Sequence, residues 1–144
     1  MARTLCEGSF TVEQQIEIAR PRETVWDLLL KPELWWSSPM PGGRMKLEAH
    51  VGGRFMVETP SGDGRLWAHV THIERPALLR LSGPLAMDTP VSSVFQYDLE
   101  ADGQHTIVRV THRAVGIINP AWAESHDAGW RRLLTALRGA SEPD

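Results

Sequence analysis

The side chains best suited to chemistry in this sequence are aromatic rings accompanied by a few polar groups. Phe95 and Tyr97 share a face of one predicted strand, and His112 points the same way from the next strand. His126 and Trp130 fall on one face of a predicted C-terminal helix. Together they would form an apolar box with a phenol and two imidazoles as orienting groups, the usual composition of a small-molecule site.

Rings from earlier in the chain are expected to complete the wall of this site. Trp67 and His69 share a face of their strand by strict alternation. The apolar residues of that strand break parity, however, and a bulge would reconcile them. The candidate ligand-binding residues are Trp36, Phe55, Trp67, His69, Phe95, Tyr97, His112, His126 and Trp130.

Each of these groups also has a purely structural interpretation. His112 can be a buried imidazole satisfied by a backbone carbonyl or by Tyr97, because buried polar groups generally find partners. Core packing is the preferred interpretation for Trp26, whereas core packing and ligand contact both stay open for Trp130. The six tryptophans of the chain could also fill the cavity themselves, and the sequence does not decide between a filled and an open cavity.

Other catalytic and metal-binding patterns are missing from the sequence. His69 and His72 resemble a metal-ligand pair, but residues three apart on a strand point to opposite faces, so no metal site is predicted. There is no nucleophile elbow, and Gly52 and Gly53 join two strands instead of forming a phosphate loop. We therefore assign no catalytic residue and no cofactor, and expect a binding protein rather than an enzyme.

Length and composition indicate one globular domain. The 144 residues fit a single domain, 1–144, with a core over about 10–139 and disordered termini. A net charge of −3 without a basic stripe argues against nucleic-acid binding. No stretch reads as a membrane span or a signal peptide. Cys6, the only cysteine, fits a reducing compartment, so we expect a cytoplasmic protein.

The longest amphipathic pattern is a helix predicted over residues 119–139. Asn119 is a suitable N-cap, Pro120 suits the first helical position, and Gly139 is suited to a left-handed stop. The helical face begins with indoles and an imidazole and ends in leucines. The residues of this face are Trp122, His126, Trp130, Leu133, Leu134 and Leu137. A helix half on a core and half over a cavity would show this pattern.

The remaining elements must supply a sheet for this helix to cover. Alternation predicts strands over residues 10–18, 45–50, 54–59, 65–74, 77–82, 92–100 and 105–115. Two short helices, 22–30 and 32–36, follow the first strand. Consecutive strands joined by turns favour an antiparallel meander. The expected class is α+β: a curved antiparallel sheet of about six to seven strands wrapped on a long C-terminal helix.

Several short segments carry a resemblance to a known family, in that family's order and over nearly the whole chain. They are 19–21, 25–27, 34–36, 51–55, Val70 with Ile73, 75–76, 106–112 (TIVRVTH) and 129–130. The chain resembles the START/Bet v 1-like (SRPBCC, helix-grip) superfamily, and within it the branch named after the activator of Hsp90 ATPase. The resemblance implies a hydrophobic cavity between sheet and C-terminal helix. It leaves the function open, because relatives bind lipids, hormones or polyketides, catalyse cyclisation or dehydration, or act as co-chaperones.

Three functions follow from this resemblance together with the residues. The preferred one is a binding module for a small hydrophobic or aromatic ligand. The second is a cyclase- or dehydratase-like enzyme, with His112 or His126 as acid–base and Tyr97 as proton donor. The third is a co-chaperone-like interaction protein with an Hsp90-type partner, for which no docking segment is evident. A homodimer is also considered, through exposed indoles such as Trp35 or Trp122.

Overall fold

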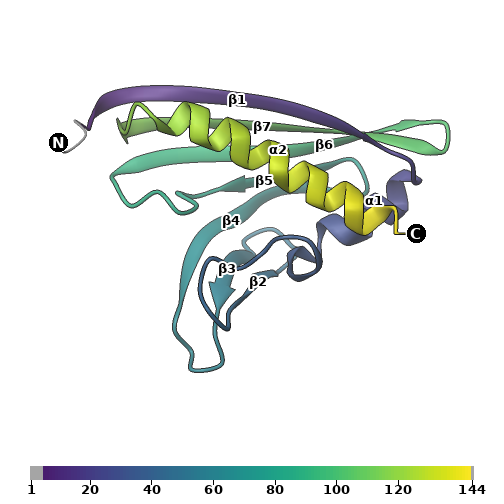
Figure 1. The fold of residues 1–144 in the computed structure, drawn as a ribbon, viewed down its shortest axis with the longest axis horizontal. Coiled ribbons are helices and arrows are strands. Elements are labelled where there is room, and N and C mark those ends of the chain that lie inside the picture. The colour runs from purple at the N-terminus through teal and green to yellow at the C-terminus, as the bar shows by residue number, and fades with distance from the viewer. Residues whose placement is uncertain (1–4, 144) are drawn as a thin grey trace.

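Seven strands, one α-helix and one short 3₁₀ turn precede a long C-terminal helix (Figure 1). The computed structural model describes residues 5–143. The elements are β1 (Cys6–Ile18), α1 (Arg22–Leu29), η1 (Pro32–Leu34), β2 (Arg44–Leu47), β3 (Arg54–Glu58), β4 (Gly64–Glu74), β5 (Leu78–Ser82), β6 (Val91–Asp102), β7 (His105–Ile118) and α2 (Trp122–Ser141). This is the α+β helix-grip arrangement predicted from the sequence.

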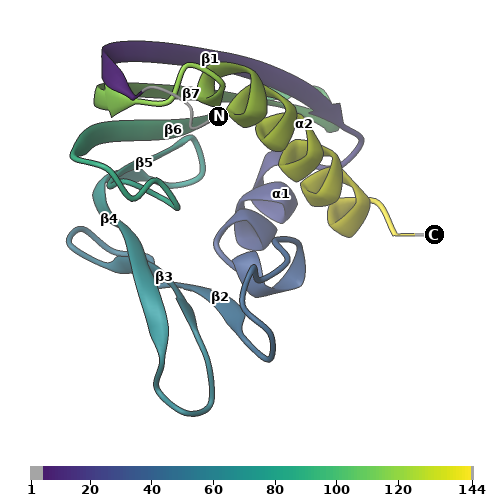
Figure 2. The same cartoon turned by 60° about the vertical axis from the view of Figure 1, so that its left-hand side comes forward.

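All seven strands join one antiparallel sheet in the order β1-β7-β6-β5-β4-β3-β2. The sheet is strongly curved: β2, β3 and β4 turn away from the plane of β1, β7 and β6 (Figure 2). Helix α2 crosses the concave side and packs against β1, while α1 lies between α2 and the short strands. The curvature and the two helices together enclose the hydrophobic core.

The side-chain periods of the sequence explain how these elements pack. In β1 the buried positions Phe10, Val12 and Ile18 all fall on one face, as alternation requires. In α2 the buried residues are Trp130, Leu134, Leu137 and Ser141, at three- and four-residue spacing. One face of the sheet and one stripe of α2 are therefore apolar, and each covers the other.

The ends of several elements differ from the prediction. Strand β1 starts at Cys6 rather than Phe10 and pairs with β7 over its whole length, so the expected disorder before residue 10 is wrong for residues 6–9. The second short helix is only the 3₁₀ turn η1. The expected disorder of residues 1–4 and 144 lies outside the described residues.

Helix α2 is shifted toward the C-terminus relative to the prediction. Asn119 does not occupy the N-cap position, but its Oδ1 accepts a hydrogen bond from the Ala121 N–H, 2.9 Å away, just before the helix. The helix also continues through Gly139 to Ser141, whose buried hydroxyl donates to the Leu137 carbonyl. Because Gly139 remains helical, the expected stop at this residue is wrong.

No helix among residues 5–143 has both the length and the apolar character required to cross a membrane.

Candidate ligand-binding site

An open pocket lies between α2 and the loop of residues 83–90. Its volume is about 170 Å³. The lining is mostly apolar and includes three of the six indoles. The lining residues are Trp36, Trp67, Leu85, Ala86, Ser125, His126, Gly129, Trp130 and Leu133. This surface suits a compact apolar molecule that is held mainly by contact with aromatic rings.

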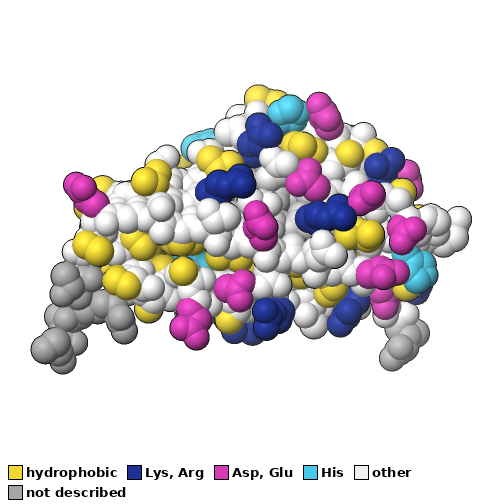
Figure 3. Space-filling view, turned by 90° about the horizontal axis from the view of Figure 1, so that it is seen from above, with side chains coloured by type: hydrophobic (Ala, Val, Ile, Leu, Met, Phe, Trp, Pro, Cys, Tyr) yellow, Lys and Arg dark blue, Asp and Glu magenta, His cyan; other side chains and the backbone are white. Residues whose placement is uncertain are grey.

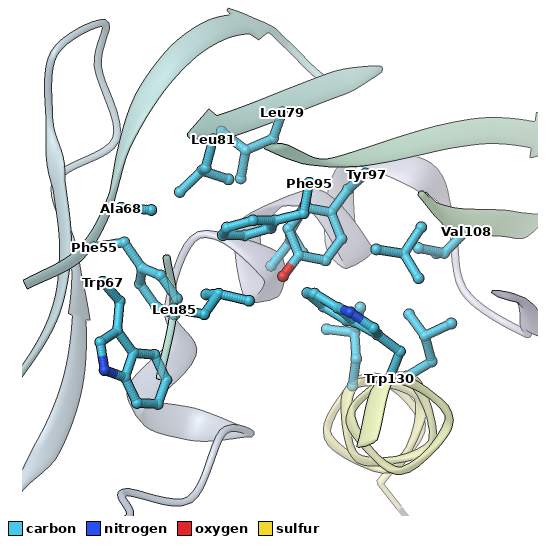
Figure 4. Packing of buried hydrophobic residues seen from close by; sticks show 14 of the residues in the cluster. Phe55, Trp67, Ala68, Leu79, Leu81, Leu85, Phe95, Tyr97, Val108 and Trp130 are labelled. Carbon is cyan, nitrogen blue, oxygen red and sulfur yellow. The ribbon is translucent and has the colours of Figure 1, made fainter. Parts of the chain in front are cut away.

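Deeper in the molecule, between the sheet and the segment formed by α1, η1 and Trp36, side chains fill almost all of the space. The gap that remains there measures only about 10 Å³, and its wall includes Phe55, Phe95 and Tyr97. Figure 4 shows Phe95 and Tyr97 extending from the sheet toward Trp130, which rises from α2. Trp36 lines both this inner gap and the outer pocket, so its indole separates the two.

Trp36 holds its place through ring contacts. The centroid of its indole lies 5.1 Å from that of Phe55, 5.9 Å from that of Trp67 and 5.9 Å from that of Trp130. These are edge-to-face or tilted arrangements within the range that aromatic pairs prefer. No hydrogen bond of the Trp36 indole nitrogen is present in the described part of the chain, so packing alone positions this ring.

His112 is fully buried, and both of its ring nitrogens have partners. The Trp130 indole Nε1 donates to His112 Nδ1 at 3.0 Å, and His112 Nε2 lies 2.6 Å from Ser93 Oγ. An indole N–H can only donate, so Nδ1 is the acceptor and Nε2 carries the proton in the neutral ring. Burial, with a smaller contribution from His126, lowers the pKa of His112 to about 4. His112 is therefore neutral near pH 7 and ties the sheet to α2.

His126 belongs to the wall of the pocket, on the turn of α2 before Trp130. Its Nδ1 lies 2.8 Å from the carbonyl oxygen of Trp122, and its ring packs against Phe10 with 5.0 Å between centroids. Burial lowers the pKa of His126, while the hydrogen bond to the Trp122 carbonyl opposes this shift. The neutral imidazole is thus favoured near pH 7.

The hydroxyl of Tyr97 points into the space between sheet and helix, toward Trp130 (Figure 4). No hydrogen bond of this hydroxyl is present among residues 5–143. Burial raises the pKa of Tyr97, which keeps the phenol neutral at physiological pH.

The structure separates the nine sequence-predicted site residues into four groups. Trp36, Trp67, His126 and Trp130 line the outer pocket. Phe55, Phe95 and Tyr97 face the inner gap, together with Trp36. His112 lies behind Trp130 and lines neither space. His69 is exposed, so its assignment to the site is wrong.

A β-bulge explains why His69 is on the other face. The β3–β4 register pairs Phe55 with Ala68 but Met56 with Leu66, which leaves Trp67 as an extra residue in β4. Both Trp67 and Ala68 are consequently buried, and the next residue, His69, points outward. The sequence indicated an irregularity in this strand without giving its position.

The other pocket residues were not predicted from the sequence. Leu85 carried a signal, because an apolar residue is unnecessary in a purely solvated loop, and it is buried here. Ser125, Gly129 and Leu133 repeat every four residues along α2, directly beside the predicted His126 and Trp130. The Ser93 partner of His112 had no sequence signal, since the pairing depends on strand register.

The indoles expected to form a dimer patch are not free surface groups. Trp35 is only 8% exposed, and its Nε1 donates to the Leu28 carbonyl at 2.8 Å. Trp122 is half-buried against the core. The expectation that these two residues are exposed is wrong for Trp35.

The curved antiparallel sheet and the long C-terminal helix that it grips define a helix-grip domain of the START/Bet v 1-like superfamily. The family described as Activator of Hsp90 ATPase homolog 1-like protein matches residues 19–142, and the chain belongs to this family. No curated protein matches the sequence.

Solved structures with the same fold come from several bacteria. Protein MLL2253 from Mesorhizobium loti is 22% identical, with a TM-score of 0.70, covering 90% of this chain and 95% of that chain. An uncharacterized protein from Rhizobium leguminosarum is 18% identical, with a TM-score of 0.74, covering 98% and 99%. The Aha1 dimer from Colwellia psychrerythraea is 18% identical, with a TM-score of 0.70, covering 92% and 96%. At these identities the likeness concerns the fold.

Proposed function

We propose that the protein binds a small hydrophobic or aromatic molecule in the pocket beside α2. The observation that carries this proposal is the pocket of about 170 Å³ with three indoles in its wall. A dry cavity of about 150 Å³ lined by apolar side chains is enough to hold benzene. The pocket is therefore large enough for a molecule of one or two rings.

We also propose a cytoplasmic location for the protein, because its single cysteine fits a reducing compartment.

The geometry of His112 favours binding over acid–base catalysis. A general base needs a free nitrogen within hydrogen-bond reach of the proton that it removes. Both nitrogens of His112 are occupied, by Trp130 and Ser93. Of the two histidines considered for the cyclase- or dehydratase-like alternative, only His126 lines the pocket.

A second candidate function is interaction with a partner protein, as the family name suggests for an Hsp90-type chaperone. One structural relative is a dimer, so self-association belongs to the same alternative. On the face seen in Figure 3, acidic and basic side chains alternate without a field of one sign. Such a surface favours no strongly charged partner. Co-purification with the chaperone and light scattering test this alternative.

Filling the pocket tests the proposed function. Gly129 lines it, and the nearest atom to an added Cβ there is Arg132 Nη2 at 3.8 Å. Gly139 lies on the same helix away from the pocket, and an added Cβ there would meet nothing within 4 Å. We expect naphthalene to raise the melting temperature of the wild type and of Gly139→Leu but not of Gly129→Leu. Equal responses of the two variants would contradict the proposal.

A further inference from the structure

One nitrogen in the pocket wall is left without a protein partner. His126 Nδ1 faces the Trp122 carbonyl oxygen at 2.8 Å, and a carbonyl oxygen can only accept. The proton of the neutral imidazole must therefore sit on Nδ1. The other nitrogen, Nε2, then presents a bare lone pair and can act only as an acceptor.

This nitrogen is open to a ligand. No hydrogen bond to His126 Nε2 is present among the described residues. Among residues 5–143, the side-chain nitrogens and oxygens that are buried and have no hydrogen-bond partner are Arg22 Nε, Trp26 Nε1 and Trp67 Nε1. His126 Nε2 is not among these atoms. Because His126 Nε2 has no hydrogen-bond partner and is not one of these buried atoms, it must be accessible from outside the protein. Because His126 lines the pocket, we infer that its unpaired Nε2 faces this space, where a bound molecule can reach it.

Few other groups in the wall can compete for a ligand's hydrogen-bond donor. The indoles of Trp36, Trp67 and Trp130 carry donors only, and that of Trp130 is already bound to His112. Ser125 is the other polar side chain, but it is exposed, and its hydroxyl lies 3.3 Å from the Trp122 carbonyl. An imidazole nitrogen that is partly removed from water is thus the main side-chain acceptor of the pocket.

The size of the pocket limits the apolar body of the ligand. Its volume of about 170 Å³ only slightly exceeds a cavity that holds benzene. Extension toward the sheet is blocked by Trp36, behind which only about 10 Å³ is open. The walled part of this open pocket therefore suits one ring or two fused rings that pack against the indoles.

We propose that the pocket selects compact aromatic molecules that carry one hydrogen-bond donor, a phenolic hydroxyl or a ring N–H, and that this donor bonds to His126 Nε2. This inference rests on the proposed function and adds the chemical class of the ligand. A ligand without the donor would leave the lone pair of Nε2 desolvated and unpaired, which costs binding free energy.

A matched pair of ligands tests the donor. 2-Naphthol and 2-fluoronaphthalene have nearly the same shape, and only 2-naphthol can donate. Equilibrium dialysis at neutral pH should show 2-naphthol binding on the order of tenfold more tightly to the wild type, the size expected for one net hydrogen bond. Equal affinities would overturn the inference and leave the proposed function standing. Failure of both ligands to bind would overturn the proposed function itself.

Two variants identify the acceptor. In His126→Phe the preference for 2-naphthol should disappear because the lone pair is lost, and 2-fluoronaphthalene should bind at least as tightly as it binds the wild type. In Ser125→Ala the tenfold preference should persist. A preference that survives in His126→Phe, or disappears in Ser125→Ala, would assign the donor to another group and overturn the inference. His126→Leu repeats the comparison with a smaller side chain, so that a packing fault in one variant does not decide the result.

Discussion

At the scale of single residues, His112 is a fully buried imidazole in a largely apolar core. It is 0% exposed, and its ring contacts Phe10, Phe95 and Trp130 with centroids 5.3, 5.9 and 5.7 Å apart. The hydrogen bonds to Ser93 and Trp130 satisfy a group that would otherwise be costly to bury. The imidazole therefore fixes the rotation of the Trp130 indole, which forms part of the pocket wall.

The low pKa of His112 makes the stability of the protein depend on pH. The folded chain protonates His112 only near pH 4, whereas the unfolded chain does so near 6.5. Between these values the unfolded state binds the extra proton, so the free energy of unfolding falls as the pH falls. The expected loss is about 3 kcal/mol over this window, at about 1.4 kcal/mol per pH unit. Urea denaturation at pH 7, 6, 5 and 4 measures it.

A His112→Gln variant isolates this contribution. Glutamine can donate and accept but does not titrate. Its stability should therefore decline less steeply between pH 6.5 and 4 than that of the wild type. Two other groups remain in the variant: His126, whose pKa is also lowered, and Glu48, whose hydrogen bonds with Arg54 lower its pKa to about 2. The difference between the two curves cancels the contribution of Glu48 and leaves that of His112 together with its coupling to His126. Parallel curves would show that His112 does not cause the slope.

The hydrogen bond from Trp130 can be weighed against an indole that makes none. Trp130 and Trp26 are both 2% exposed, but Trp26 Nε1 has no hydrogen-bond partner. Trp130→Phe and Trp26→Phe remove a similar volume, and only Trp130→Phe leaves a buried acceptor, His112 Nδ1, unpaired. We expect Trp130→Phe to be more destabilising by about 1–3 kcal/mol in urea denaturation. Equal losses would mean that the bond to His112 adds no stability.

These residues also mark what the sequence could predict about the site. The inward direction of His112 followed from alternation along its strand, and Trp130 followed from the helical period. Their hydrogen bond did not, because it depends on the rotation of two rings from separate elements. From the sequence alone, a backbone carbonyl or Tyr97 is the expected partner of His112, whereas in the structure the partners are Ser93 and Trp130.

At the scale of elements, strand β4 decides which side chains reach the pocket. A bulge next to β3 places Trp67 and Ala68 on the same side, and a second register shift beside β5 lies between Val70 and His72. Strict alternation holds only between such irregularities. The strand itself was predictable from its apolar residues, but the positions of its bulges depend on pairing with both neighbouring strands.

Gly83 follows β5 and lies against the bulge at Trp67 and Ala68 of β4. Because glycine has no side chain, the two backbone segments can approach each other closely. A Cβ at Gly83 would overlap the Trp67 carbonyl oxygen and lie 2.5 Å from Ala68 Cα. Both are backbone atoms that cannot turn aside. We expect Gly83→Ala to lower the free energy of unfolding by roughly 1–3 kcal/mol or more. An unchanged stability would show that the strand can shift without cost.

Gly139→Ala provides the opposite control on α2. An added Cβ there meets nothing within 4 Å, and the residue is helical and exposed. Alanine should raise the free energy of unfolding by up to about 0.5–1 kcal/mol, because it loses less backbone entropy than glycine on folding. Urea denaturation of Gly83→Ala and Gly139→Ala under one condition compares their free energies of unfolding. A loss in Gly83→Ala alone would come from the close contact and not from replacing glycine in general.

At the scale of the whole molecule, the fold was predictable while the extent of the cavity was not. The order of periodic segments determines an antiparallel sheet covered by one helix, since no other element has a comparable apolar stripe. How much space remains inside depends on how six large indoles turn. The structure resolves the alternative left open by the sequence: the interior is nearly filled, and an open pocket remains at its edge.

Trp36 sets this boundary, so removing its ring should join the two spaces. Trp36→Ala is expected to cost about 2–4 kcal/mol of stability, somewhat less than the loss of a fully buried indole, because Trp36 is half-buried. The enlarged pocket should bind pyrene, a four-ring molecule that we expect the wild type to exclude while it binds naphthalene. Equilibrium dialysis with both hydrocarbons measures this change in selectivity.

Trp35→Ala is the matched control for this change. Trp35 is the neighbouring indole, with its centroid 5.6 Å from that of Trp36, but it lines neither the outer pocket nor the inner gap. Its removal should also destabilise the fold without admitting pyrene, because Trp36 would still separate the spaces. Pyrene binding to Trp35→Ala would attribute the gain to general loosening of the core. Pyrene binding to the wild type would mean that Trp36 moves aside on its own, and the size limit of the pocket would then be set by the sheet and α2.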